Sequence, residues 1–221
     1  MADTRLLKKD LFGEVRLISS LDRTTIVRDT ESAPIWIAWL ARLLLRREAR
    51  VLAALDDLDG VPELIEQTRS RLVRSFIAGE PMQIAKPKDP DYYRRALRLL
   101  RALHGRNVVH NDLAKEPNLL VTEDGIPAFL DFQLGWAPRR RGRLFRALAY
   151  EDLRHLLKHK RTYCPDDLSA RQRRILENPS WPSRAWRRTV KPVYLFVTRR
   201  LLGWADREGA GDRGAVGKDR S

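Results

Sequence analysis

Two polar loops joined by an apolar hairpin form the feature of this sequence that most limits its fold. The stretch "HNDLAKEPNLLVTEDGIPAFLDFQLG" covers residues 110–135 and contains Asp112, Asn118 and Asp131. An Asp-Gly pair separates the apolar runs "NLLV" and "PAFLDF", and this pair is a strong signal for a hairpin turn. Because antiparallel strands of this length return the chain to its starting end, we expect Asn118 and Asp131 to lie together at one mouth of the hairpin.

The three polar side chains have the chemistry that phosphoryl transfer requires. A carboxylate in a solvent-facing loop, such as Asp112, can accept a proton from a hydroxyl nucleophile. Asn118 and Asp131 offer oxygen ligands, and Mg²⁺ accepts so small a set because it keeps waters and takes further oxygens from substrate phosphates. The alternative is a loop of ordinary polar turn residues. The apolar flanks and the amphipathic helix expected just before the stretch favour a working site.

The remaining sequence predicts a β-rich part followed by a mostly helical part. Residues 13–29 and 61–82 each suggest two short strands, and "TTIVR" is rich in β-branched residues. Apolar residues at helical spacing predict helices at 34–58, 90–104, 146–160, 166–177 and 184–204. The tail at 207–221 has almost no apolar content, which is typical of a disordered segment.

These elements together resemble the protein-kinase-like superfamily. The catalytic loop of that superfamily reads His-x-Asp followed by Asn, and the next hairpin ends in Asp-Phe-Gly. In this sequence the corresponding elements are "HND", Asn118 and "DFQ". Upstream, "TIVR" resembles the Val-Ala-Ile-Lys strand, and Glu48 in "RREARVL" is similar to the helix glutamate that pairs with its lysine. The short chain resembles compact RIO-type and bacterial lipopolysaccharide-type kinases more than full-size eukaryotic kinases.

The resemblance implies an α+β fold in two lobes. We expect one domain over residues 1–206, with a small β-rich N-lobe at about 1–82 and a minimal helical C-lobe at about 83–206. Residues 207–221 would be the tail. Asp152 in "EDLRHLL" is similar to a buried helix aspartate that braces the catalytic loop, and His110 is expected to brace the same loop.

The resemblance also implies ATP and Mg²⁺ as cofactors and a hydroxyl-bearing acceptor. Six residues would form the site: Asp112 and Lys115 in catalysis, Asn118 and Asp131 on the metal, and Arg28 with Glu48 on the nucleotide phosphates. Lys115 could instead be a solvated side chain. Resemblance to RIO-type kinases implies a serine or threonine of a protein as acceptor, and a sugar on a membrane lipid is the enzymatic alternative.

The sequence departs from the family pattern in four places. Three of them, Arg28, the missing Gly-rich loop and Gln133, motivate a third reading, a pseudokinase that binds nucleotide or acts as a scaffold, whereas the intact Asp112, Asn118 and Asp131 argue against it. Arg28 replaces the phosphate-binding lysine, and its guanidinium has a different reach and geometry. Only Gly13 and a Ser19-Ser20 turn are left where the family has a Gly-rich loop over the nucleotide. The spacing from Asp112 to Asn118 is one residue longer than usual, and Gln133 replaces the glycine after "DF".

The charge favours anionic partners. The formal net charge is +14, yet no nucleic-acid recognition motif is present. The segments "IWIAWLARLLLRR" and 181–204 interleave basic and aromatic residues, which favours contact with an anionic membrane surface. The most apolar window, 35–45, is shorter than the roughly 20 residues of a membrane span. With one cysteine, Cys164, no internal disulfide can form. We therefore expect a cytoplasmic protein, with peripheral attachment to the inner membrane face as an alternative.

Overall fold

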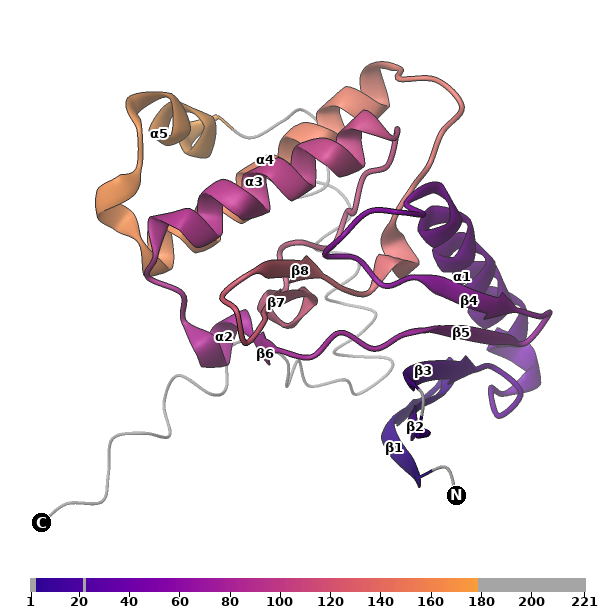
Figure 1. The fold of residues 1–221 in the computed structure, drawn as a ribbon. Helices are drawn as coiled ribbons and strands as arrows, with labels where there is room; N and C mark the ends of the chain where they lie inside the picture. The colour runs from indigo at the N-terminus through magenta and orange to yellow at the C-terminus, as the bar shows by residue number, and fades with distance from the viewer. Residues whose placement is uncertain (1–2, 22, 179–221) are drawn as a thin grey trace, which may run out of the picture. The chain divides into compact units, whose positions relative to one another are not determined.

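The computed structural model describes residues 3–21 and 23–178, and its N-terminal part is an antiparallel sheet in the order β1-β2-β3-β5-β4 (Figure 1). This sheet and the helices around it confirm the predicted α+β class. The five strands are β1 (Asp3–Asp10), β2 (Gly13–Ser19), β3 (Thr24–Asp29), β4 (Leu64–Gln67) and β5 (Arg71–Ser75).

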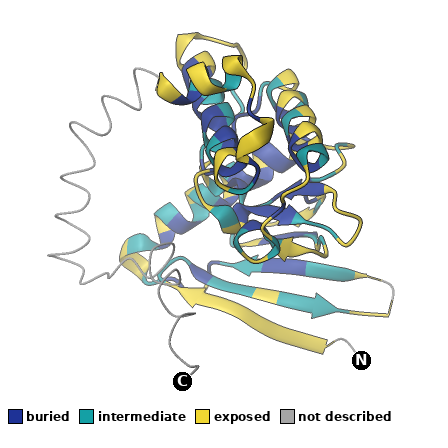
Figure 2. Ribbon diagram, turned by 90° about the vertical axis from the view of Figure 1, so that its left-hand side faces the viewer, coloured by how far each residue is buried: buried dark blue, intermediate teal, exposed yellow. Residues whose placement is uncertain are grey.

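Strand β1 was not predicted from the sequence. All of its residues are exposed, as Figure 2 shows, because it is an edge strand that packs neither face into the core. Its sequence therefore lacks the apolar–polar alternation by which a half-buried strand is recognised.

The register of the sheet places the Ser19-Ser20 turn away from Arg28. Arg28 of β3 lies opposite Val15 at the start of β2, whereas Ser19 pairs with Thr24 at the other end. The Ser19-Ser20 turn therefore lies at the far end of the sheet from Arg28. It is not placed to cover a nucleotide held by Arg28, which corrects that part of the prediction. The turn nearer Arg28 is the one between β1 and β2.

Helix α1 (Ile35–Ala54) connects β3 to β4 and packs against the sheet. Its Leu45 and Ala49 form a buried cluster with Leu72 of β5. The predicted helix at 34–58 ends four residues early, because the chain turns at Leu55–Leu58 and Asp57 adopts a positive φ of 62°.

The C-terminal part of the described chain is mostly helical. The small sheet β6-β7-β8 lies between α3 and the five-stranded sheet (Figure 1). The predicted helix at 184–204 and the tail at 207–221 lie outside the described residues. The elements in order are β6 (Glu80–Pro81), α2 (Met82–Ala85), α3 (Pro90–Gly105), η1 (Glu116–Asn118), β7 (Leu119–Val121), β8 (Pro127–Phe129), η2 (Phe132–Leu134), α4 (Arg143–Tyr163), η3 (Pro165–Asp167) and α5 (Ala170–Glu177).

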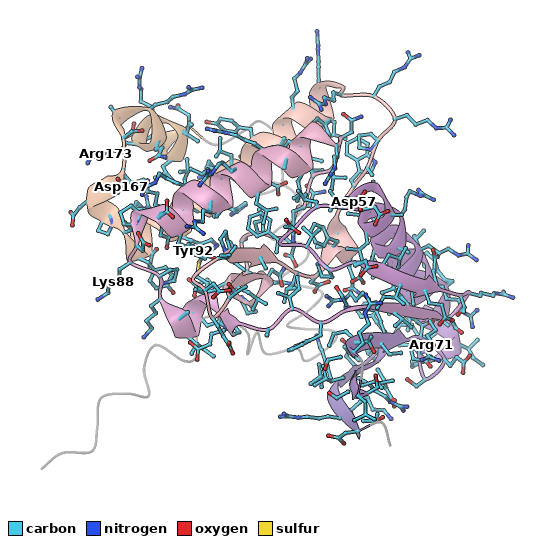
Figure 3. All side chains as sticks on the ribbon, in the orientation of Figure 1. Asp57, Arg71, Lys88, Tyr92, Asp167 and Arg173 are labelled. Atoms are coloured by element: carbon cyan, nitrogen blue, oxygen red, sulfur yellow. The ribbon has the colours of Figure 1, made fainter. Side chains whose placement is uncertain are left out.

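Helix α3 fixes the position of the β7–β8 hairpin. Asp89 caps the helix by accepting a hydrogen bond from the Asp91 amide at 2.8 Å, and Pro90 occupies the first helical position. Tyr92 points from α3 toward the hairpin, and its hydroxyl donates to the Leu120 carbonyl at 3.0 Å (Figure 3). One apolar core joins the helix face to the hairpin and to α4; its members include Leu100, Leu103, Leu113, Leu119, Phe129, Phe132 and Leu156.

Candidate active site

A buried carboxylate on α4 organises the loop that follows α3. Both oxygens of Asp152 accept backbone hydrogen bonds, from the His110 amide at 2.7 Å and from the Asn111 amide at 2.9 Å. Asn111 has a φ of 64°, a left-handed conformation that asparagine tolerates better than most residues. The contacts are those expected of a bracing aspartate, and they fix the backbone directly before Asp112.

We predict that Asp152→Asn lowers the free energy of unfolding by about 1–3 kcal/mol, because one of the two buried amides then faces an NH₂ group and loses its acceptor. Urea denaturation followed by circular dichroism measures this loss. Asp166→Asn is the matched control, since Asp166 is exposed just beyond α4. Equal stabilities of the two variants would contradict the bracing role.

His110 braces the same loop as a neutral side chain. Its Nε2 lies 2.9 Å from the Leu130 carbonyl, and the Asp112 amide donates to its Nδ1 at 3.3 Å. These partners require the proton on Nε2. Burial lowers the pKa of His110, and nearby Asp152 only partly opposes that effect. The imidazole therefore connects the loop to the end of β8 and is bound in a structural position.

Asp112, Asn118 and Lys115 lie together. The Asn118 side-chain amide donates to the Asp112 carbonyl at 2.9 Å and to its Oδ2 at 3.0 Å. Lys115 Nζ lies 3.0 Å from the same Oδ2. Because Asn118 uses its nitrogen for Asp112, its amide oxygen is the atom that remains to face a cation.

The extra residue between Asp112 and Asn118 is accommodated by η1. The Asn118 amide donates to the Lys115 carbonyl at 3.1 Å, which closes a single tight turn. Glu116 anchors this turn to α4, since the Tyr163 hydroxyl donates to its Oε2 at 2.8 Å. The longer spacing therefore leaves Asn118 in contact with Asp112.

The hairpin brings Asp131 to the same end as Asn118. The Leu130 amide donates to the Asn118 carbonyl at 2.9 Å, so the residue directly before Asp131 pairs with Asn118. Asp131 has a φ of 59°, a strained conformation of the kind that collects at functional sites. Its Oδ1 is buried and makes no hydrogen bond with the described residues, which leaves an orphaned oxygen for a ligand.

Two arginines and one glutamate form a cluster of ion pairs next to Asp131. Glu48 of α1 is fully buried, and its Oε2 lies 3.3 Å from Arg28 Nε. Its Oε1 lies 3.5 Å from Arg74 Nε, and Arg28 Nη2 lies 3.8 Å from Asp131 Oδ1. Burial lowers the pKa of the Arg74 guanidinium, whereas Glu48 acts in the opposite direction. The predicted pair of Arg28 and Glu48 is therefore present, with Arg74 as an unpredicted third member.

Arg74 and Arg47 are site residues that the sequence reasoning missed. Arg74 stands two positions after buried Leu72, so both side chains lie on the inward face of β5. A charged residue at an inward-facing strand position was the sequence signal that could have identified Arg74. Arg47 of α1 donates to the Leu134 carbonyl at 3.1 Å and also to the carbonyl of the next residue. No sequence pattern marks this second contact, which joins α1 to the segment after Asp131.

Comparison with known proteins agrees with this geometry. Residues 27–134 match the sequence pattern of the RIO domain. The chain contains a RIO-type, protein-kinase-like domain. The matched range begins one residue before Arg28 and ends three residues after Asp131, so it contains the elements from the end of β3 through the hairpin to η2. No relative was found among curated protein sequences.

A solved structure supports the fold. The crystal structure of the Rio2 kinase from Chaetomium thermophilum matches with a TM-score of 0.58 at 14% sequence identity. The match covers 81% of this chain and 63% of that chain, so this chain spans less than two thirds of the Rio2 kinase structure. At this level of identity the likeness concerns the fold of the RIO domain.

Asn118 and Asp131 can supply two protein ligands to a bound Mg²⁺. No cluster of three or more histidine, cysteine or acidic residues suited to a metal occurs in the described part of the chain. A site built from Asn118 and Asp131 needs no such cluster, because Mg²⁺ usually binds through one or two protein ligands plus waters and phosphates. The orphaned Asp131 oxygen is the structural observation that fits this role.

Proposed function

We propose that this RIO-type chain is an ATP- and Mg²⁺-dependent phosphotransferase, a RIO-like serine/threonine protein kinase. The observation that carries the proposal is two sets of contacts that meet at the end of the hairpin. One runs from Asp112 through Asn118 to Leu130, the neighbour of Asp131. The other runs from Asp131 through Arg28 to Glu48. Together the two sets combine a base, oxygen ligands for a cation and guanidinium groups for phosphate, which are the parts that phosphoryl transfer uses.

Each residue would have one role. Asp112 would orient the acceptor hydroxyl and accept its proton, using Oδ1, because Oδ2 already accepts from Asn118 and Lys115. Lys115 would neutralise charge on the transferred phosphoryl group. Asn118 and Asp131 would hold Mg²⁺, which when bound neutralises charge on the phosphate oxygens. Arg28, held by Glu48, would contact the nucleotide phosphates.

The proposal also names the molecule whose hydroxyl accepts the phosphate. The RIO-type domain supports a serine or threonine hydroxyl of a protein, and a sugar on a membrane lipid remains the alternative acceptor. Both acceptors present a hydroxyl to Asp112, so the site chemistry is the same for both. The mass of the phosphorylated product distinguishes them.

Arg28 supports a second candidate, a pseudokinase that binds nucleotide without transferring phosphate. Its guanidinium lies 3.8 Å from Asp131 Oδ1, where it can occupy part of the space that a cation would use. In that case Asp131 would be neutralised by Arg28, and nucleotide binding would not depend on Mg²⁺.

We predict that Mg²⁺ tightens ATP binding to the wild-type chain and that Asp131→Asn removes this dependence. Isothermal titration with and without Mg²⁺ measures both. Asparagine tolerates the positive φ at this position, so the backbone is retained. Asp124→Asn, an exposed turn residue of the same hairpin, is the control and should behave like the wild type. ATP binding that is equally tight without Mg²⁺ would favour the pseudokinase and contradict the metal site.

A further inference from the structure

The N-terminal half of α1 has its large and small residues in the reverse of the usual arrangement. The residues that face inward are small: Ala38 and Ala41 form a cluster with Ala33, against which Phe12 of the β1–β2 turn packs. The large apolar residues face outward, with exposed fractions of 95% for Ile35, 64% for Trp36, 66% for Trp39 and 53% for Leu43. Soluble helices normally bury their largest apolar side chains.

The outward residues form one continuous stripe. At 3.6 residues per turn, Ile35, Trp36, Trp39 and Leu43 lie within about 100° of one another around the helix. Arg46 and Arg50, which are exposed, fall on the same stripe one and two turns further along the helix. The outer face of α1 is therefore apolar and aromatic near its N-terminus and cationic toward its C-terminus.

We propose that this outer face of α1, defined by Ile35, Trp36, Trp39, Leu43, Arg46 and Arg50, docks on an anionic lipid surface. Tryptophan favours the boundary between headgroups and acyl chains, because its ring is apolar and its N–H is polar. Arginines on the same stripe complement lipid phosphates, and the chain's net charge of +14 adds a long-range attraction. A protein partner would explain the apolar residues, whereas the lipid surface explains both the apolar residues and the cations.

The docked orientation leaves the candidate active site accessible. Glu48 lies nine residues after Trp39, so it points about 180° away from it around the helix. The face that meets the lipid and the face that meets Arg28 are thus on opposite sides of α1. None of the described helices is long and apolar enough to cross a bilayer, and the proposed contact is one in which α1 lies on the surface.

Flotation with two kinds of vesicles tests the proposal on the full chain. Vesicles of phosphatidylcholine alone are compared with vesicles of phosphatidylcholine and phosphatidylglycerol in equal parts. We expect binding to the anionic vesicles only, weakened at high salt. Trp36→Ser/Trp39→Ser should reduce the partition coefficient by about tenfold or more. Arg46→Gln/Arg50→Gln should reduce it by about 25-fold, roughly fivefold for each arginine.

Controls separate docking from misfolding and from other surfaces. Ile84→Ser/Ile126→Ser replaces two exposed isoleucines outside α1 and should bind like the wild type. All variants change exposed residues, so their melting temperatures should match the wild type. Binding that the α1 variants leave unchanged would overturn the proposal, because another segment would then carry it. The proposal would also be overturned if the chain formed a dimer in the absence of lipid and Trp36→Ser/Trp39→Ser dissociated that dimer. The outer face of α1 would then be a contact between two copies of the chain.

Discussion

Glu48→Gln should destabilise the chain by about 3–5 kcal/mol, since breaking a buried ion pair by removing one partner leaves uncompensated charge. Glu48 is fully buried and is the acidic partner of both Arg28 and Arg74. Removing its charge leaves two guanidinium groups facing each other, with only the more distant Asp131 to offset them. Urea denaturation monitored by tryptophan fluorescence gives the free energy of unfolding.

A surface pair provides the matched control. Glu63 pairs with Arg23, and both side chains are largely exposed. Glu63→Gln should therefore cost no more than about 1 kcal/mol. A second variant, Glu48→Leu/Arg74→Met, replaces one ion pair with apolar groups and should be more stable than Glu48→Gln. If Glu48→Gln and Glu63→Gln cost the same, the buried cluster does not have the role assigned to it.

Asp112→Asn should lower the rate of phosphoryl transfer by a factor of about 10²–10⁴, the usual contribution of a positioned general base. Asparagine can still accept the hydrogen bond from Asn118, so the loop should keep its conformation. The affinity for ATP should change little, because Asp112 faces the acceptor. Steady-state kinetics with varied ATP separates the two effects.

Asp124→Asn again serves as the control for this measurement, since it removes an exposed carboxylate from the β7–β8 turn, twelve residues after Asp112. It should transfer phosphate at the wild-type rate. An Asp112→Asn variant with wild-type activity would show that Asp112 is not the base. An equal loss in both variants would point to a general effect on folding.

The kinase-like fold was predicted from the resemblance of the motifs in and before the hairpin to the protein-kinase-like superfamily. An Asp-Gly pair between two short apolar runs predicted the β7–β8 hairpin, and the amphipathic spacing from Tyr93 to Leu103 predicted α3 closely. The RIO domain match and the Rio2 kinase structure confirm the kinase-like fold. The contact between Arg28 and Glu48 followed from the same resemblance, and the structure contains it at 3.3 Å. The roles assigned to the six site residues stay predictions.

The features that sequence reasoning missed depend on contacts between distant segments. Strand β1 has no buried face, so its residues carry no periodic signal. Arg74 joins the site only because β5 pairs with β3, which places Arg74 opposite Ile26 and two residues from Leu72. Arg47 donates to backbone carbonyls 87 and 88 residues away in the chain. Every residue has a backbone carbonyl, so the sequence does not mark these acceptors. Such contacts are visible only after the fold is known.

Transfer of the γ-phosphate is the most direct test of the central claim. The purified chain is incubated with Mg²⁺ and ATP labelled in the γ-phosphate, with protein and lipid acceptors supplied in separate reactions, and ATP labelled in the α-phosphate is the control. We expect γ-label to appear in a hydroxyl-bearing product, no transfer of α-label, and loss of the γ-label signal in Asp112→Asn. Absence of any transfer above the Asp112→Asn level, with both acceptors present, would contradict the proposal that this chain is a phosphotransferase.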